Sequence, residues 1–189
     1  MSDSVAFCMV LHIHQPVGNF GHVFERAFAR SYEPFLSALE EHEKIRLSLH
    51  VSGPLLDWIA DHHPEYIGRL RRLVNAGRIE MLGGGYYEPI LTAIPERDAD
   101  GQLPLMAAEL ERRFGVRPTG IWLTERIWEP SLPALLARNG VQYTLLDETQ
   151  LPRRRRAAGR DARVLRDRKT RRPRGGVPHQ KRFALRDPV

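Results

Sequence analysis

The hydrophobic and polar positions of the first 150 residues follow two alternating periods. Short runs rich in Val, Ile and Leu are typical of buried strands. Between them lie longer segments whose apolar residues recur every three or four positions, as in amphipathic helices. We expect strands at residues 5–13, 45–51, 78–82, 119–124 and 143–147. We expect helices at residues 23–43, 54–76, 96–114 and 132–139.

This alternation of strands and helices predicts an α/β fold with a parallel sheet covered by helices. About five such βα units fit into the first 150 residues, with short connections between them. A sheet that keeps adding βα units either stays open or closes into a barrel, and the periodicity alone does not distinguish the two.

Residues 151–189 differ sharply from the rest of the chain. Residues 1–150 hold 14 basic and 20 acidic side chains, a net charge of −6, whereas residues 151–189 hold 15 basic and 3 acidic ones, a net charge of +12. We therefore divide the chain into a domain at 1–150 and an Arg/Pro-rich tail at 151–189. The tail is expected to be disordered, or to derive from a shifted reading frame in a GC-rich gene.

The charge distribution also bears on partners. The acidic first 150 residues show no nucleic-acid footprint, so we expect no such partner apart from nonspecific binding by the basic tail. Cys8 is the single cysteine of the chain, which excludes an internal disulfide and suits a reducing compartment. No signal peptide is visible, and no apolar run approaches the roughly 20 residues that span a bilayer. We expect a cytoplasmic protein without a membrane partner.

Candidate chemistry gathers at the ends of the expected strands, where parallel βα folds bind their ligands. The side chains found there are His12, His14, His50, Glu88, Glu125, Asp147 and Glu148. Tyrosines and tryptophans stand close to several of them in the sequence. Aromatic rings can stack on sugar faces while carboxylates handle hydroxyl groups and protons, so the pattern favours a carbohydrate site.

The histidine pair and the glutamate after the glycines leave alternatives open. His12 and His14 are two residues apart, so a strand would place both on one face, where they could bind the backbone, a zinc ion or a substrate hydroxyl. Glu88 follows the run Gly83–Gly84–Gly85 and is either an exposed loop residue or a site residue. The glycines fit neither spacing of the common phosphate-binding loops.

Glu125 follows an apolar strand and has Trp122 and Trp128 nearby. It could simply pair with Arg126, but a partly desolvated carboxylate beside an arginine can stay ionised, which is the state that a nucleophile needs. Asp147 and Glu148 could bind substrate or could begin a solvated turn.

Three segments resemble glycoside hydrolase family 57, the group of α-amylases, amylopullulanases, branching enzymes and 4-α-glucanotransferases. The first is Leu-His-Ile-His-Gln-Pro at residues 11–16. The second is Gly-Gly-Gly-Tyr-Tyr-Glu-Pro at residues 83–89, and the third is Trp-Leu-Thr-Glu-Arg-Ile-Trp-Glu-Pro at residues 122–130. The last two are most similar to the amylase and 4-α-glucanotransferase members.

The resemblance implies a (β/α)7 barrel, of which residues 1–150 would form an incomplete part. It implies a retaining mechanism on α-glucans such as starch, glycogen or maltodextrin, with no required metal or other cofactor. It assigns the role of nucleophile to Glu125. It also suggests substrate contacts for the aromatic and polar residues of the three segments, namely His12, His14, Glu88, Trp122 and Trp128.

The general acid of that family is an aspartate in a later segment, which has no counterpart in this sequence; Asp147 comes too early in the order of strands. We therefore expect little or no activity from this chain. Two other functions remain open: a metal-dependent carbohydrate deacetylase that uses His12, His14 and a carboxylate for Zn²⁺, and a glucan-binding fragment without catalysis.

Overall fold

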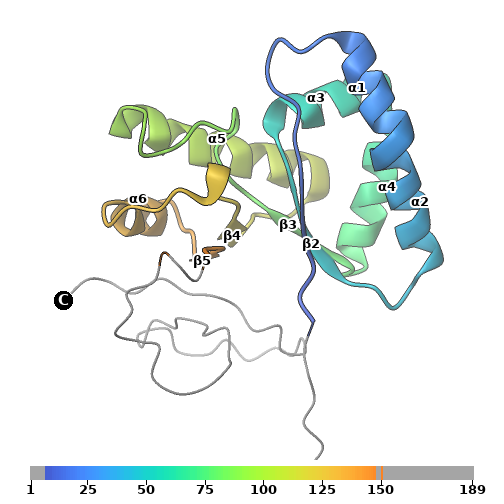
Figure 1. Cartoon of the computed structure of the whole chain (residues 1–189). Coiled ribbons are helices and arrows are strands. Elements are labelled where there is room, and N and C mark those ends of the chain that lie inside the picture. The colour runs from blue at the N-terminus through green and yellow to red at the C-terminus, as the bar shows by residue number, and fades with distance from the viewer. Residues whose placement is uncertain (1–6, 148–149, 151–189) are drawn as a thin grey trace, which may run out of the picture.

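The computed structural model describes residues 7–147 and residue 150. Figure 1 shows parallel strands flanked by helices. The strands are β1 (Val10–Ile13), β2 (Leu47–Val51), β3 (Ile79–Leu82), β4 (Gly120–Ile121) and β5 (Tyr143–Thr144). The helices are α1 (Gly21–Ala27), α2 (Glu33–Glu41), α3 (Gly53–His62), α4 (Pro64–Asn75), α5 (Glu96–Phe114) and α6 (Leu132–Arg138). The tail at 151–189, Glu148 and the start of the first expected strand lie outside the described residues.

All pairings between these strands are parallel and follow the order of the sequence. β1, β2 and β3 form one sheet, and β4 pairs with β5. A single bridge between Gly83 and Ile121 joins the two parts. The prediction of an α/β fold with parallel strands is thus confirmed. The strands 119–124 and 143–147 were predicted too long, because the backbone leaves extended pairing after Ile121 and Thr144.

Two predicted helices are interrupted. The helix expected at 23–43 consists of α1 and α2 joined by a π-helical turn (η1, Phe28–Tyr32). The helix expected at 54–76 is two helices, because Pro64 lacks an N–H group and disfavours helical geometry in the residue before it. His63 accordingly has φ −136° and ψ 58°. The helices expected at 96–114 and 132–139 are present as α5 and α6.

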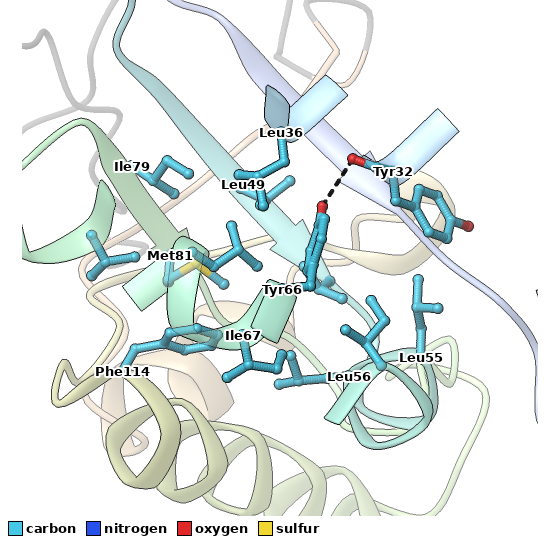
Figure 2. Packing of buried hydrophobic residues seen from close by; sticks show 14 of the residues in the cluster. Tyr32, Leu36, Leu49, Leu55, Leu56, Tyr66, Ile67, Ile79, Met81 and Phe114 are labelled. Carbon is cyan, nitrogen blue, oxygen red and sulfur yellow. Dashed lines mark hydrogen bonds between the residues drawn. The ribbon is translucent and has the colours of Figure 1, made fainter. Parts of the chain in front are cut away.

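A large apolar core fills the space between the β1–β3 sheet and helices α1 to α4, which gather along one side of that sheet (Figures 1 and 2). Leu49 in the central strand β2 and Leu36 in α2 are fully buried. Tyr66 of α4 is also buried, and its hydroxyl donates to the carbonyl of Tyr32 at 3.2 Å. The polar tip of this ring is therefore satisfied inside the core.

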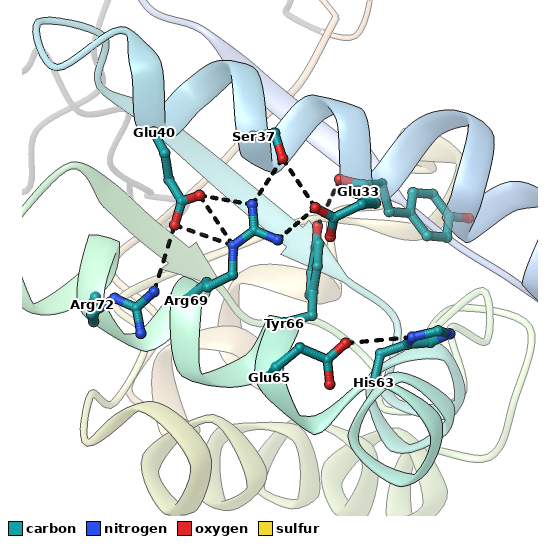
Figure 3. A network of polar contacts seen from close by, with 9 residues as sticks. Glu33, Ser37, Glu40, His63, Glu65, Tyr66, Arg69 and Arg72 are labelled. Atoms are coloured by element: carbon teal, nitrogen blue, oxygen red, sulfur yellow. Dashed lines mark hydrogen bonds and ion pairs between the residues drawn. The ribbon is translucent and has the colours of Figure 1, made fainter.

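A polar network ties α4 to α2 at the rim of this core (Figure 3). The guanidinium of Arg69 donates to Glu33 at 2.5 Å, to Glu40 at 2.7 Å and to Ser37 at 2.9 Å. These hydrogen bonds lower the pKa of the Glu40 carboxyl and raise that of Arg69. Arginine suits this position because its planar fork can engage several acceptors at once.

A second, smaller core lies between β4, α6 and the first half of α5, and includes Leu103, Ile121 and Leu136. The second half of α5 packs on the first core through residues such as Met106 and Phe114. Helix α5 therefore connects the two parts. Within the ranges 7–147 and 150, no helix is both long and apolar enough to cross a membrane.

Candidate active site

A pocket of about 270 Å³ opens at the carboxyl ends of the strands. Its lining residues come from all three sequence segments described above: His12, His14, Glu88, Trp122, Thr124, Glu125 and Arg126. The fold therefore gathers in one place residues that are more than 100 positions apart in the sequence. Five of the six predicted site residues line this pocket.

The glycines after β3 let the two parts of the sheet approach each other closely. The Gly83 N–H donates to the carbonyl of Gly120, and the Trp122 N–H donates to the carbonyl of Gly83, both at 2.9 Å. A Cβ atom on Gly84 would lie 2.8 Å from His50 Nε2 and 3.1 Å from the carbonyl oxygen of Trp122. Any side chain at residue 84 would therefore push the tryptophan segment away from the histidines.

The histidines form a stack on one wall. The parallel register of β1 and β2 sets His12 directly beside His50, and their Nδ1 atoms are 2.8 Å apart. The ring of Trp122 also stacks on His12, and the two ring centroids are 4.7 Å apart. Burial and the neighbouring His14 lower the pKa of His12 to about 4, although Glu125 opposes this shift. Burial lowers the pKa of His50 to about 3, so both rings are neutral at physiological pH.

Glu88 is the carboxylate on which the histidines converge. Its side chain is only 5% exposed, and Oε2 contacts Nδ1 of His14. Its Oε1 lies 3.5 Å from His12 Nε2 and 3.7 Å from His50 Nδ1. Burial, and then the charge of Glu125, raise the pKa of Glu88 to about 7. Near neutral pH this group can therefore either donate or accept a proton.

Unfavourable backbone conformations concentrate at the pocket. Among the described residues, three non-glycine residues have positive φ: Glu88 at 54°, Glu125 at 54° and Arg126 at 52°. All three line the pocket. Such conformations cost about 1–3 kcal/mol each and tend to cluster where function requires a particular side-chain direction.

Glu125 lies on a 3₁₀ turn (Thr124–Arg126) after β4, and its side chain is exposed. The residue is thus more exposed than the expectation of a partly desolvated carboxylate implied, because the strand ends before residue 125, but it still lines the pocket. The ion pair formed by Arg126 is with Asp147, at 3.4 Å. Asp147 is exposed, and its backbone N–H donates a hydrogen bond to Oε1 of Gln150 at 3.0 Å.

Trp128 is not among the pocket-lining residues and instead packs against the second core. Conversely, sequence reasoning did not select His50, Thr124 or Arg126 as site residues. His50 was visible as a polar residue at the end of an apolar strand, but only the register of β1 and β2 shows that it contacts His12. Within the part of the chain that the structure describes, one group of residues could hold a metal: His12, His50 and Glu88, whose candidate ligand atoms lie within 4.8 Å of one another. His14, expected as the partner of His12, is not in this group.

The protein is thus a parallel α/β fold whose strand ends present carboxylates, histidines and a tryptophan around one pocket. The chain belongs to glycosyl hydrolase family 57, whose family model matches residues 8–173. The α-amylase of Pyrococcus furiosus is 44% identical over 148 residues, which are 78% of this chain and 23% of the amylase. The 4-α-glucanotransferase of Thermococcus litoralis is 42% identical over 146 residues, which are 77% of this chain and 22% of that protein. The chain thus spans less than a quarter of the length of these curated relatives.

Solved structures agree on the fold. The crystal structure of the Thermococcus litoralis 4-α-glucanotransferase matches with a TM-score of 0.72 over 75% of this chain and 22% of that chain. A family 4 carbohydrate esterase from Streptomyces lividans, solved in complex with acetate, matches with a TM-score of 0.53 at 16% identity, over 74% of this chain and 60% of that chain. The second likeness concerns the fold alone.

Proposed function

We propose that this chain carries the nucleophile side of the active site of a glycoside hydrolase or transglycosylase that acts on α-glucans by a retaining mechanism. The observation that carries the proposal is that Glu125, Glu88 and Trp122 meet His12 and His14 in one pocket. Two further observations support it: the family membership, and relatives named α-amylase and 4-α-glucanotransferase. We further propose that residues 1–150 are part of a (β/α)7 barrel.

In this proposal the Glu125 carboxylate attacks the anomeric carbon and forms a glycosyl ester. Its place on the exposed turn leaves it accessible to a bound sugar. Retaining glycosidases need a second carboxyl group, about 5–5.5 Å from the first, to protonate the leaving oxygen and later to activate water or an acceptor sugar. By the resemblance, that group is an aspartate in a later segment of the family.

The remaining pocket residues are proposed to bind the sugar. His12 and His14 present neutral imidazoles with both donor and acceptor capacity. Glu88, with its pKa near 7, can donate to or accept from a hydroxyl. Trp122 supplies apolar surface for a sugar ring. For Trp128, the packing on the second core supports a role in holding the segment that carries Glu125.

A substrate whose leaving group needs no proton tests the role of Glu125 in the chain as it stands. With α-maltosyl fluoride, the carboxylate oxygen bonds to the anomeric carbon while the C–F bond breaks and fluoride departs with the electron pair. Without the acid/base group, which typically contributes about 10²–10⁴-fold, the resulting ester should break down slowly and accumulate. We expect intact-mass spectrometry to show one maltosyl adduct, and peptide mapping to place it on Glu125.

The matched variants are Glu125→Gln and Glu129→Gln, two exposed glutamates four residues apart, of which only Glu125 lines the pocket. Labelling should vanish in the first variant and persist in the second. An adduct that survives Glu125→Gln would remove this residue from the role of nucleophile. Binding of starch or maltodextrin without any adduct would instead favour a glucan-binding fragment.

A further inference from the structure

Tyr86 lies two residues before Glu88, in the segment that follows β3, and connects that segment to the helices beside the first core. It is only 8% exposed, and it is not among the residues that line the pocket. We propose that Tyr86, held through its hydroxyl by Asp57 of α3, is a positioning residue that fixes the Glu88 carboxyl for sugar binding. This role rests on the sugar-binding function proposed above for Glu88.

Tyr86 is held at its backbone, its ring and its hydroxyl. Its carbonyl accepts a hydrogen bond from the Gly53 N–H, at the start of α3, at 2.9 Å. A Cβ atom on Gly53 would lie 2.7 Å from three atoms of the Tyr86 ring, so the ring packs directly on the first turn of that helix. One turn further along α3, Asp57 Oδ2 accepts a hydrogen bond from the Tyr86 hydroxyl. These three contacts fix the side chain against one helix.

Asp57 is in turn held by α5. Nη2 of Arg113 donates to Asp57 Oδ1 at 2.8 Å, and Nε of Arg113 donates to Glu109, one turn earlier in α5. The two oxygens of Asp57 are thereby divided between Arg113 and Tyr86. Burial, and then the hydrogen bond to Asp57, raise the pKa of Tyr86 above its ordinary value, so the hydroxyl keeps the proton that it donates. The segment after β3 is therefore tied to both α3 and α5.

The chain between Tyr86 and Glu88 is a tight turn. The Glu88 N–H donates to the carbonyl of Gly85 at 3.0 Å, and a Cβ atom on Gly85 would lie 2.7 Å from Cδ of Pro89. Glu88 has a φ of 54°, an unfavourable conformation that persists only where the surrounding contacts impose it. Tyr86 supplies such contacts on the amino-terminal side of the turn. Loss of its hydrogen bond should therefore let the Glu88 side chain move.

The position of the Glu88 carboxyl matters for binding more than for attack. Its Oε2 contacts His14, and its Oε1 lies 3.5 Å from His12 Nε2. A hydrogen bond between two oxygen atoms needs a separation of about 2.5–3.0 Å, so a displaced carboxyl would lose its bond to a sugar hydroxyl. Glu125 is positioned separately, by the turn after β4. We therefore expect Tyr86 to affect sugar affinity and not the rate of attack.

The test is the rate of maltosyl labelling of the full chain, measured against the concentration of α-maltosyl fluoride. The half-saturating concentration reports sugar binding, and the limiting rate reports attack by Glu125. Tyr86→Phe keeps the ring and removes the hydroxyl, so we expect the half-saturating concentration to rise roughly tenfold while the limiting rate stays within about threefold. A variant that is merely less stable would lose labelled fraction and keep its half-saturating concentration.

Matched variants identify the hydrogen bond itself. Tyr87→Phe removes the hydroxyl of the neighbouring tyrosine, which is 54% exposed, and should keep both constants within about twofold. Asp57→Asn retains an oxygen that can accept from Tyr86 and should keep affinity within about threefold, whereas Asp57→Ala should resemble Tyr86→Phe. Equal shifts in Tyr86→Phe and Tyr87→Phe, or a fall in the limiting rate alone, would overturn the proposal.

Hydrogen exchange separates failure of this role from failure of the proposed function. In the sugar-free chain, we expect the Glu88 amide to exchange roughly tenfold faster in Tyr86→Phe than in Tyr87→Phe, because its bond to Gly85 opens more often. If the unaltered chain forms no maltosyl ester, the glycosidase proposal fails, and exchange alone decides whether Tyr86 holds the turn. Unchanged exchange at Glu88 would overturn the positioning role even where labelling is normal.

Discussion

The two parts of the sheet contrast in how firmly they are built. β1 to β3 have four or five residues each and rest on a large core shared with α1 to α4. β4 and β5 have two residues each and rest on the smaller core under α6. The first part supplies the proposed binding groups, His12, His14 and Glu88, whereas the second supplies Trp122 and Glu125.

The two parts of the sheet therefore position their site residues in different ways. The first part holds its site residues by strand register and burial. The second part ends its strand early and positions Glu125 by a turn with left-handed backbone conformation. The pocket depends on the junction at Gly83 and Gly84, where both parts meet.

The largest expected effect compares the two cores. Leu49→Ala in β2 and Leu136→Ala in α6 each remove a fully buried leucine. Such substitutions typically cost about 2–5 kcal/mol, depending on how far the surroundings collapse into the cavity. We expect Leu49→Ala near the upper end and Leu136→Ala near the lower, measured by urea denaturation. Equal losses would argue that the two cores unfold as one unit with the same rigidity.

The next prediction concerns Gly84, at the junction between the two parts of the sheet. Gly84→Ala places a Cβ atom against His50 and the Trp122 backbone, so we expect a loss of about 1–3 kcal/mol from overpacking. Gly101→Ala in α5 meets nothing within 4 Å and should stabilise the helix by about 0.5–1 kcal/mol. Thermal denaturation of both variants checks this. A neutral Gly84→Ala would show that the contact there is easily relieved.

A third comparison separates the two tryptophans of the second part. Trp122→Ala removes a pocket wall and should weaken maltoheptaose binding roughly tenfold, or about 1.4 kcal/mol, in isothermal calorimetry. Trp128→Ala removes packing on the second core and should lower the unfolding free energy while leaving affinity within about threefold. The reverse assignment of effects would restore Trp128 as a substrate contact.

The smallest effect concerns the polar network of the first part. Arg69 lowers the pKa of Glu40 from its ordinary 4.5, so this carboxylate stabilises the fold above that pH and loses the contribution as the pH falls below it. Glu40→Gln should therefore cost up to about 1 kcal/mol at pH 7, and the deficit should shrink in acid. Urea denaturation across pH 3–7 measures this. Glu41→Gln, at an exposed neighbouring position, should change nothing.

The sequence by itself determined the class of fold and most of the proposed site. Periodicity placed each helix and strand close to its observed position, because burial of one helix face or of a whole strand leaves a direct trace in the pattern. Strand-end placement and the three segments selected His12, His14, Glu88, Trp122 and Glu125, all of which line the pocket. The helix break at Pro64 was missed by the predicted helix at 54–76, although proline restricts the residue before it.

Only the tertiary structure decided which of these side chains touch. His50 joins His12 because of the strand register, a relation between segments 38 residues apart that no local pattern encodes. Trp122 and Trp128 look equivalent in the sequence, yet one lines the pocket and the other packs on the second core. The left-handed backbone at Glu88 and Glu125 likewise depends on surrounding contacts, since residues of this type favour other conformations when tertiary packing does not hold them.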